Sequence, residues 1–463
     1  MQQSRTEKKK FFKTVQGDRL VFKPVKSLIY SLYGDCFRVY RMNSTQVALD
    51  YVSGLLRCEK GHENMERMVE KVENSDYGRY VHFLSSSPWD EKEVNRITML
   101  EVNRQLSEQK KLSGKPTALT IDETSHLKKG VKSVGVSRQY AGVSGKTDNC
   151  QVSVHISLSN EKYCSLIGTK LYLPKSWIDD VKRCEAAGIP ESDRKFKTKP
   201  ELALELVKEA AVKGVEFDFI NGDGLYGHNS ELTRALDDVG KLYVLDIHKD
   251  DTIFLSEPTF SVPEKKSDKG RTPKLLKPDI ESIQVQAYLK ALTDKDFKSV
   301  KVRKTTKGWK KSKVHTVEVW QWDGNEEKAK KRTLLITVSD KVKYSLSNGK
   351  PEEYSAEEWA YFQCSRYWVE RCFDDSKNEL GMSGYQVTGW VAWQHHMALV
   401  MMAGLYLLSL KLEYKNEMPL LSVRDARLMV IAINFASDKE VDLCMEHMHK
   451  RHIQRQKDID RYY

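Results

Sequence analysis

Three charged residues in the segment SRYWVERCFDDSKNELG have a spacing that could serve phosphate chemistry. On a helix with about 100° per residue, Arg366, Glu370 and Lys377 fall on one stripe, which also includes Gln363. A carboxylate between two cations fits a site where the carboxylate binds a metal ion and the cations bind phosphates. The segment therefore indicates a nuclease-like site.

Two further acids follow short apolar segments that are typical of strands. Asp122 ends the strand TALTID, and Asp223 ends the strand EFDFINGD. Acidic residues at the carboxyl ends of strands in an open sheet point toward the ligand-binding crevice, although aspartate is also a common turn former. The glycines beside Asp223 favour a close backbone approach. With Glu370, these acids give three carboxylates from three elements, as in sites that bind two Mg²⁺ ions.

The elements that must position these acids alternate in type along the chain. We expect helices over about 25–110, which would form an N-terminal domain. We then expect strands and helices at 117–122, 150–159, 163–173, 201–213, 216–223, 229–239 and 242–247. The strand at 150–159 alternates apolar and polar residues, which is typical of a half-buried strand. This order predicts an α/β fold with a mixed sheet.

The segment 251–335 interrupts this order. It contains a loop rich in proline and lysine and then a predicted β-ribbon, so we expect a β-rich insertion. The chain is predicted to be helical again from about 355, including an apolar run at 397–410 that is too short to span a bilayer and fits a buried helix. We therefore expect a catalytic core over 111–250 and 336–412, and a helical tail over 413–463.

The composition favours a protein that meets polyanions in a reducing compartment. The 463 residues include 76 Lys and Arg against 65 Asp and Glu, a formal net charge of +11. This excess is compatible with nucleic-acid partners but does not identify them. The eight cysteines include no CxxC pair, which argues against a zinc ribbon or a disulfide framework. The basic N-terminus MQQSRTEKKKFFK has no apolar signal-peptide core, so we expect a cytoplasmic protein without membrane contact.

The order Asp122, Asp223, Glu370 on this scaffold resembles the DDE transposases of bacterial insertion sequences, which have an RNase H-like core. The helix predicted around Glu370 is similar to their Tyr-x2-Arg-x3-Glu-x6-Lys signature. Gln363 stands at the tyrosine position, which is a departure from that pattern.

Further segments resemble one branch of these transposases. They are SVGVSRQYAGVSGKTDNCQV at 133–152 and GYQVTGWVAWQHH at 384–396. The resemblance covers roughly 110–412. The N-terminal helical region is similar only in its general pattern, and we expect it to bind DNA or to be an ordinary helical bundle.

The resemblance implies a catalytic function and a set of partners. Asp122, Asp223 and Glu370 would bind two Mg²⁺ ions, for which Mn²⁺ can substitute, cut the transposon ends and join them to target DNA. The active form would be a homodimer on paired ends of double-stranded DNA, associated with the nucleoid. The residues expected to contact DNA are Arg366, Lys377, Tyr367, Lys128, Lys129, Arg138 and Lys146.

Alternatives remain open on the sequence alone. The same core could belong to a structure-selective nuclease that never joins strands, or to a catalytically silent DNA-binding regulator. The basic residues after the first strand could also form a solvated loop.

Overall fold

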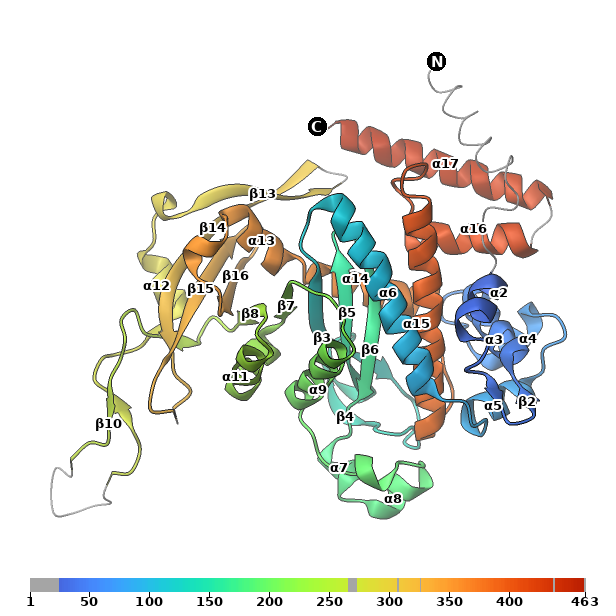
Figure 1. Cartoon of the computed structure of the whole chain (residues 1–463), viewed down its shortest axis with the longest axis horizontal. Helices are drawn as coiled ribbons and strands as arrows, with labels where there is room; N and C mark the ends of the chain where they lie inside the picture. The colour runs from blue at the N-terminus through green and yellow to red at the C-terminus, as the bar shows by residue number, and fades with distance from the viewer. Residues whose placement is uncertain (1–24, 265–272, 306–307, 325, 436–437, 462–463) are drawn as a thin grey trace. The chain divides into compact units, whose positions relative to one another are not determined.

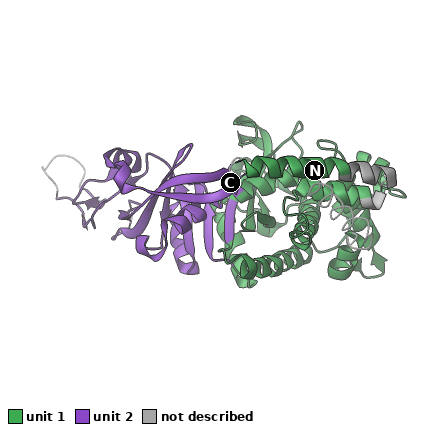
Figure 2. Ribbon diagram, turned by 90° about the horizontal axis from the view of Figure 1, so that it is seen from above, with its two compact units in different colours: residues 1–117, 122–216, 368–461 green, residues 118–121, 217–367, 462–463 purple. Residues whose placement is uncertain are grey.

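The chain divides into two units, and each contains strands of a mixed sheet (Figure 2). The computed structural model describes residues 25–264, 273–305, 308–324, 326–435 and 438–461, without the side chains of 433–445. Of these residues, unit 1 contains those within 1–117, 122–216 and 368–461, and unit 2 contains 118–121 and those within 217–367. The basic N-terminal segment and the side chain of Cys444 lie outside the described residues.

The strands of unit 2 form the sheet that carries Asp223. Their order is β13 (Lys298–Thr305), β14 (Gly308–Gln321), β15 (Lys330–Val338), β16 (Val342–Ser347), β8 (Leu242–Ile247), β7 (Phe219–Gly222) and the beginning of β3 (Ala118–Leu127). β3, β7 and β8 are parallel, and the other strands are antiparallel. The parallel register aligns Thr120 of β3 with Asn221 of β7.

Helix α13 (Ala356–Cys364) packs against the strands of unit 2. Its Trp359 and Phe362 lie in a core with Phe219 and Leu335. The remaining elements of this unit are α10 (Gly224–Gly227), α11 (Ser230–Val239), α12 (Val285–Ala291), η3 (Asp294–Asp296), η4 (Pro351–Glu353) and the two-stranded pairs β9 (Thr252–Ile253) with β12 (Ile283–Gln284) and β10 (Phe260–Ser261) with β11 (Lys277–Pro278).

The segment expected to be an insertion takes part in the unit 2 sheet. β13 and β14 lie within 251–335, and β14 pairs with β15, which pairs with β16. The β-ribbon expected there is thus present, and it continues the strands of the core. The domain boundaries expected from the sequence stay a prediction.

The strands of the large sheet that belong to unit 1 are the rest of β3 from Asp122, β5 (Lys146–Asn160), β4 (Ser137–Ala141) and β6 (Tyr163–Leu171). β5 pairs antiparallel with β4 near its beginning and with β6 further along. The expectation that this strand is half-buried is wrong, because its polar residues Ser153, His155 and Ser157 are as buried as its apolar ones. The ring of His155 lies 5.3 Å from that of Phe373, so a helix covers the polar face.

Helices cover the strands of unit 1, and α6 and α15 lie side by side against β6 (Figure 1). In chain order the elements before β3 are α2 (Val25–Leu28), η1 (Ile29–Tyr33), β1 (Arg38–Val39), β2 (Met42–Asn43), α3 (Thr45–Arg57), α4 (Met65–Lys71), α5 (Tyr77–Ser85) and α6 (Glu91–Ser113). The later ones are α7 (Lys175–Ile178), α8 (Val181–Ala186), η2 (Glu191–Asp193), α9 (Lys199–Val212), α14 (Tyr367–Glu379), α15 (Trp390–Glu413), α16 (Val423–Phe435) and α17 (Asp438–Asp460).

α15 is long and apolar enough, by length and composition, to cross a membrane, but 83% of its most apolar window is buried. This burial fits the core helix expected from the run at 397–410. The cysteines whose side chains are described are free thiols, in line with the sequence-based expectation.

Candidate active site

The pairing of β3 with β7 brings acidic side chains together. Asp122 and Asp223 each follow, by two residues, the aligned pair Thr120 and Asn221 of these parallel strands. Asp122, Glu123 and Asp223 each offer a carboxylate oxygen, and these oxygens lie within 4.8 Å of one another. The sequence indicated the two aspartates but not Glu123, because consecutive residues of a strand normally point to opposite faces.

The sequence analysis placed Asp122 at the end of its strand, and this expectation is wrong. Asp122 lies within β3. The strand continues to Leu127. The carboxylate of Asp122 is buried and accepts a hydrogen bond from the backbone N–H of Glu123 at 2.8 Å. The residues after Asp122 are polar but buried, including Thr124 and Ser125, so the sequence pattern did not reveal them as part of a strand.

Asp223 was expected to be the last residue of its strand. It lies directly after β7, whose last residue is Gly222, and is the N-cap of α10. Its carboxylate accepts a hydrogen bond from the backbone N–H of Leu225 at 3.0 Å. Gly227 has a packing role, because a Cβ there would lie 2.0 Å from the carbonyl oxygen of Asp246 on β8. This glycine therefore allows α10 to approach the neighbouring strand, which fixes the chain after Asp223.

Glu370 lies on α14 of unit 1, and its side chain is exposed. It is not among the three acids whose oxygens lie within 4.8 Å of one another in the described part of the chain. Its participation in the acidic site stays a prediction.

The single helical stripe expected from Gln363 to Lys377 is interrupted. α13 ends at Cys364, a turn contains Ser365 and Arg366, and α14 begins at Tyr367. No glycine or proline marks this break, so periodicity predicted one continuous helix. The four residues therefore do not share one helix: Gln363 belongs to α13, and Lys377 belongs to α14.

Gln363 and Arg366 make contacts inside unit 2. The amide of Gln363 is 1% exposed and donates to the Ser345 hydroxyl at 2.6 Å, and its carbonyl oxygen accepts a hydrogen bond from Thr337. Arg366 forms an ion pair with Asp246 at 3.4 Å. The residue at the tyrosine position of the signature is thus a buried hydrogen-bonding residue, while the phosphate contact of Arg366 stays a prediction.

Tyr367 is 38% exposed, and its ring already has a cationic neighbour in unit 2. The guanidinium carbon of Arg303 lies 4.2 Å from the centroid of this ring. An arginine and an exposed aromatic ring at this distance form a cation–π pair. The pair presents an aromatic surface beside a positive charge, which is a combination that binds unpaired bases.

Lys377 connects α14 to β3 inside unit 1. Its ammonium donates to the Thr124 hydroxyl at 2.6 Å and to the Ser125 carbonyl oxygen at 3.3 Å. Burial lowers the pKa of Lys377 from 10.5 to about 8. This internal contact was not expected from the sequence, which assigned the lysine to DNA phosphates.

Lys128 also makes internal contacts in unit 1, unlike the other basic residues after the first strand. Its ammonium donates to the Tyr385 carbonyl oxygen at 3.0 Å and lies 3.4 Å from the centroid of the Tyr385 ring. Burial lowers the pKa of Lys128 to about 8. Lys129, Arg138 and Lys146 are exposed. Their DNA contacts stay predictions.

The acidic group suits a hard divalent cation. It offers only carboxylate oxygens, which Mg²⁺ and Mn²⁺ accept readily, and no thiolate or imidazole that would favour a softer metal. Carboxylates this close repel one another, and a bound divalent cation would reduce that repulsion.

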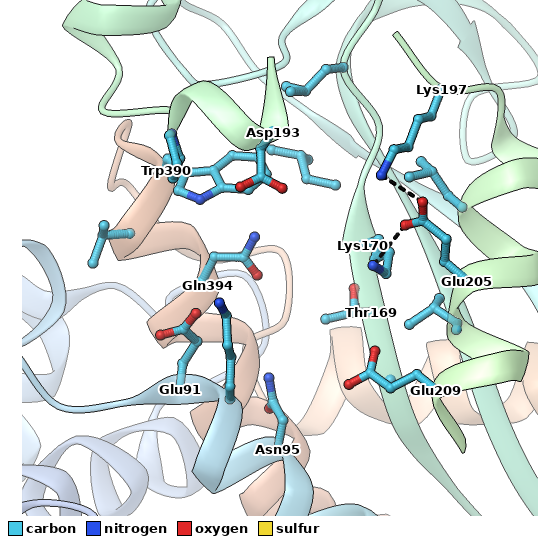
Figure 3. A pocket seen from close by; sticks show the side chains of 18 of the residues that line it. Glu91, Asn95, Thr169, Lys170, Asp193, Lys197, Glu205, Glu209, Trp390 and Gln394 are labelled. Atoms are coloured by element: carbon cyan, nitrogen blue, oxygen red, sulfur yellow. Dashed lines mark hydrogen bonds and ion pairs between the residues drawn. The ribbon is translucent and has the colours of Figure 1, made fainter. Parts of the chain in front are cut away.

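A cavity of about 340 Å³ lies elsewhere in unit 1, between α6, β6, α9 and the beginning of α15 (Figure 3). Lys170 and Lys197 on its wall both form ion pairs with Glu205, at 2.9 and 2.6 Å. The cavity includes none of the site residues expected from the sequence. It therefore does not enlarge the acidic site.

A family model and a sequence relative agree on one class of protein. A family model described as "DDE superfamily endonuclease" matches residues 33–309. The "Probable transposase for insertion sequence element IS701" of Microchaete diplosiphon is 27% identical over 330 residues, which are 70% of this chain and 71% of that protein. A solved structure, the piggyBac transposase synaptic complex with hairpin DNA, is similar over 93% of this chain and 84% of that one, with 13% identity and a TM-score of 0.37.

Proposed function

Because the chain belongs to the DDE superfamily endonuclease family and is a transposase of the insertion-sequence type, we propose that it cuts the ends of its element and joins them to target DNA. Its fold is the mixed α/β type with an RNase H-like core. The observation that carries the proposal is the meeting of Asp122 and Asp223 at the paired strands β3 and β7.

Asp122, Asp223 and Glu370 hold two Mg²⁺ ions in this proposal, and Mn²⁺ can replace them. When bound, such ions activate the attacking oxygen and stabilise the leaving oxygen of a phosphodiester. The chain's own contribution is to fix the acids, through the β3–β7 register for Asp122 and through the start of α10 for Asp223. Glu370 is presented from the exposed side of α14.

DNA is the partner, and basic residues supply the contacts. We propose that Lys129, Arg138 and Lys146 contact phosphates, since all three are exposed and β4 is the last strand in the order of its sheet. Arg366 and Tyr367 remain proposed contacts near the scissile bond, whereas the internal hydrogen bonds of Lys128 and Lys377 favour a structural role for these two lysines. The active form would be a homodimer on two paired ends, working in the cytoplasm at the nucleoid.

One assay tests the activity directly. The purified protein is incubated with Mg²⁺ and DNA carrying the termini of its element, and excised and joined products are separated on a gel. Glu370→Gln should abolish cleavage while leaving binding of the ends within about threefold, because the amide keeps the shape but loses the charge that holds a cation.

Asp374→Asn is the matched control, since Asp374 is another exposed acid on α14. It should cleave at a rate close to that of the unaltered protein. Cleavage without joined products would identify a nuclease that only hydrolyses. Full cleavage by Glu370→Gln would remove Glu370 from the site.

A further inference from the structure

Glu123 has an unusual position for the neighbour of a strand-borne catalytic acid. Alternation along β3 would direct its side chain away from that of Asp122. One of its oxygens nevertheless lies within 4.8 Å of an oxygen of Asp122. The longer side chain of Glu123 therefore reaches back toward the acidic site.

Lys199 holds Glu123 in this place. Its ammonium lies 3.0 Å from Oε1 of Glu123, and the two side chains are only 22% and 21% exposed. Both residues belong to unit 1, one on β3 and the other at the beginning of α9. The pair is thus a largely buried contact between a strand and a helix.

The position of Lys199 on α9 does not serve the helix itself. Lys199 is the first residue after the N-cap Thr198, where a positive charge opposes the helix dipole. The beginning of the helix is already secured by a capping box, in which Thr198 and Glu201 exchange hydrogen bonds. A lysine at this position is better explained by its partner Glu123 than by helix stability.

We propose that Glu123 is a fourth carboxylate of the metal site and that Lys199 is a built-in cation that a divalent ion displaces from it. The inference rests on the proposed function and goes further by assigning a regulator to that site. Without a divalent ion, the ammonium reduces the repulsion between Glu123 and Asp122. A divalent ion binds the carboxylates directly and carries twice the charge, so it replaces the lysine. Lys199 therefore sets the concentration of ion at which the site fills.

The sign and size of the effect follow from this competition. Removing the ammonium should strengthen metal binding, because a competitor and a repelling charge are both lost. Partly buried ion pairs are worth somewhat more than exposed ones, so we expect Lys199→Met to tighten binding about 3- to 30-fold. Glu123→Gln should weaken binding about 10-fold because one ligand loses its charge.

The experiment measures Mn²⁺ binding to the full-length protein without DNA, by the signal of free Mn²⁺ in electron paramagnetic resonance. Lys199→Arg keeps the charge and should bind like the unaltered protein. Lys197→Met is the matched control, because Lys197 lies two residues before Lys199 in sequence and forms a similar ion pair, with Glu205. In the double variant with Glu123→Gln, Lys199→Met should tighten binding much less than it does alone, because only the repelling charge is then lost; such non-additivity in a double-mutant cycle indicates a direct coupling.

Asp122→Asn separates the two proposals. If it abolishes Mn²⁺ binding while Lys199→Met leaves the affinity unchanged or weaker, this inference is wrong and the metal site stands. If Asp122→Asn leaves binding unaltered, the proposed metal site itself is wrong. Circular dichroism of each variant checks folding, and tighter binding by Lys199→Met cannot result from a misfolded site.

Discussion

Lys377 offers the sharpest test of how the strand with Asp122 is held. Its ammonium donates to the Thr124 hydroxyl at 2.6 Å and to the Ser125 carbonyl oxygen at 3.3 Å, so it connects α14 to β3 two residues beyond Asp122. We therefore expect Lys377→Met to impair cleavage through the position of Asp122. A phosphate-binding lysine would instead impair DNA binding.

The expected effect on stability is small because two contributions oppose each other. Hydrogen bonds from a charged donor contribute about 1.5–3 kcal/mol each, and the longer bond to Ser125 contributes less. The lowering of the Lys377 pKa from 10.5 to about 8 corresponds to about 3 kcal/mol of unfavourable burial at neutral pH. That cost is an upper value, since the side chain keeps some contact with water. The free energy of unfolding of Lys377→Met should thus change by about 1 kcal/mol.

The expected effect on catalysis is larger. Displacement of a reacting group by about 1 Å can slow a reaction about 100-fold. We expect the single-turnover cleavage rate of bound DNA to fall about 10- to 100-fold in Lys377→Met. The slope of log Kd against log salt concentration should stay unchanged, because no phosphate contact is lost.

The control variants are Arg138→Met and Lys146→Met, at exposed positions on β4 and β5. Each should reduce the salt slope by about 0.9, as expected for one phosphate contact, and leave cleavage of saturated DNA nearly unchanged. The reasoning about Lys377 is refuted if Lys377→Met reduces the salt slope by about the same amount while bound DNA is cleaved at the normal rate.

Two further predictions concern stability. Burial lowers the pKa of Lys128 to about 8, so between pH 8 and 9.5 the unfolded chain binds more protons than the folded one, and the free energy of unfolding should rise with pH. Lys128→Met should remove much of this rise in denaturant titrations, whereas Lys129→Met, at an exposed position, should keep it. Asp425 is buried, and burial alone would raise the pKa of its carboxyl group. Hydrogen bonds from His452 and Arg455 nevertheless hold this pKa below the usual range. Asp425→Asn should therefore lower the free energy of unfolding by about 3 kcal/mol at pH 7, with the difference fading as pH falls below about 4; equal stability at pH 7 would contradict this.

The strands that bring Asp122 and Asp223 together could be predicted from the sequence, because each contains a short run of apolar residues that is buried. β7 ends at Gly222, one residue before the expected end of the strand at Asp223. The prediction failed where polar residues are buried. Thr124 and Ser125 on β3, and Ser153 on β5, have the side chains of surface residues, but helices and neighbouring strands enclose them. Hydropathy alone cannot identify such positions.

The break between α13 and α14 was beyond prediction for a different reason. The sequence around Ser365 lacks a helix breaker, and the Ser365 hydroxyl donates to the Tyr361 carbonyl oxygen at 2.6 Å, a bond that is also available inside a helix. The break follows from packing, since Phe362 and Gln363 are buried in unit 2. Periodicity placed Glu370 and Lys377 correctly on one helix, but it could not separate them from Gln363.

The roles of the lysines near the acidic residues could not be assigned from the sequence. A lysine near an acidic site can bind the DNA phosphate, or it can hold the acids in place when no metal ion is present. Residues 123–125 of β3 receive two such lysines in unit 1, Lys199 at Glu123 and Lys377 at Thr124 and Ser125. They come from different helices, so both constrain the same short piece of strand from separate directions. The neighbouring carboxylates of Asp122 and Glu123 repel each other, and contacts with two cations oppose the displacement that this repulsion favours. The basic residues of a DNA-cutting enzyme therefore cannot all be assigned to DNA. Exposure distinguishes the two groups, because Lys199 and Lys377 are partly buried, whereas Arg138 and Lys146 are exposed.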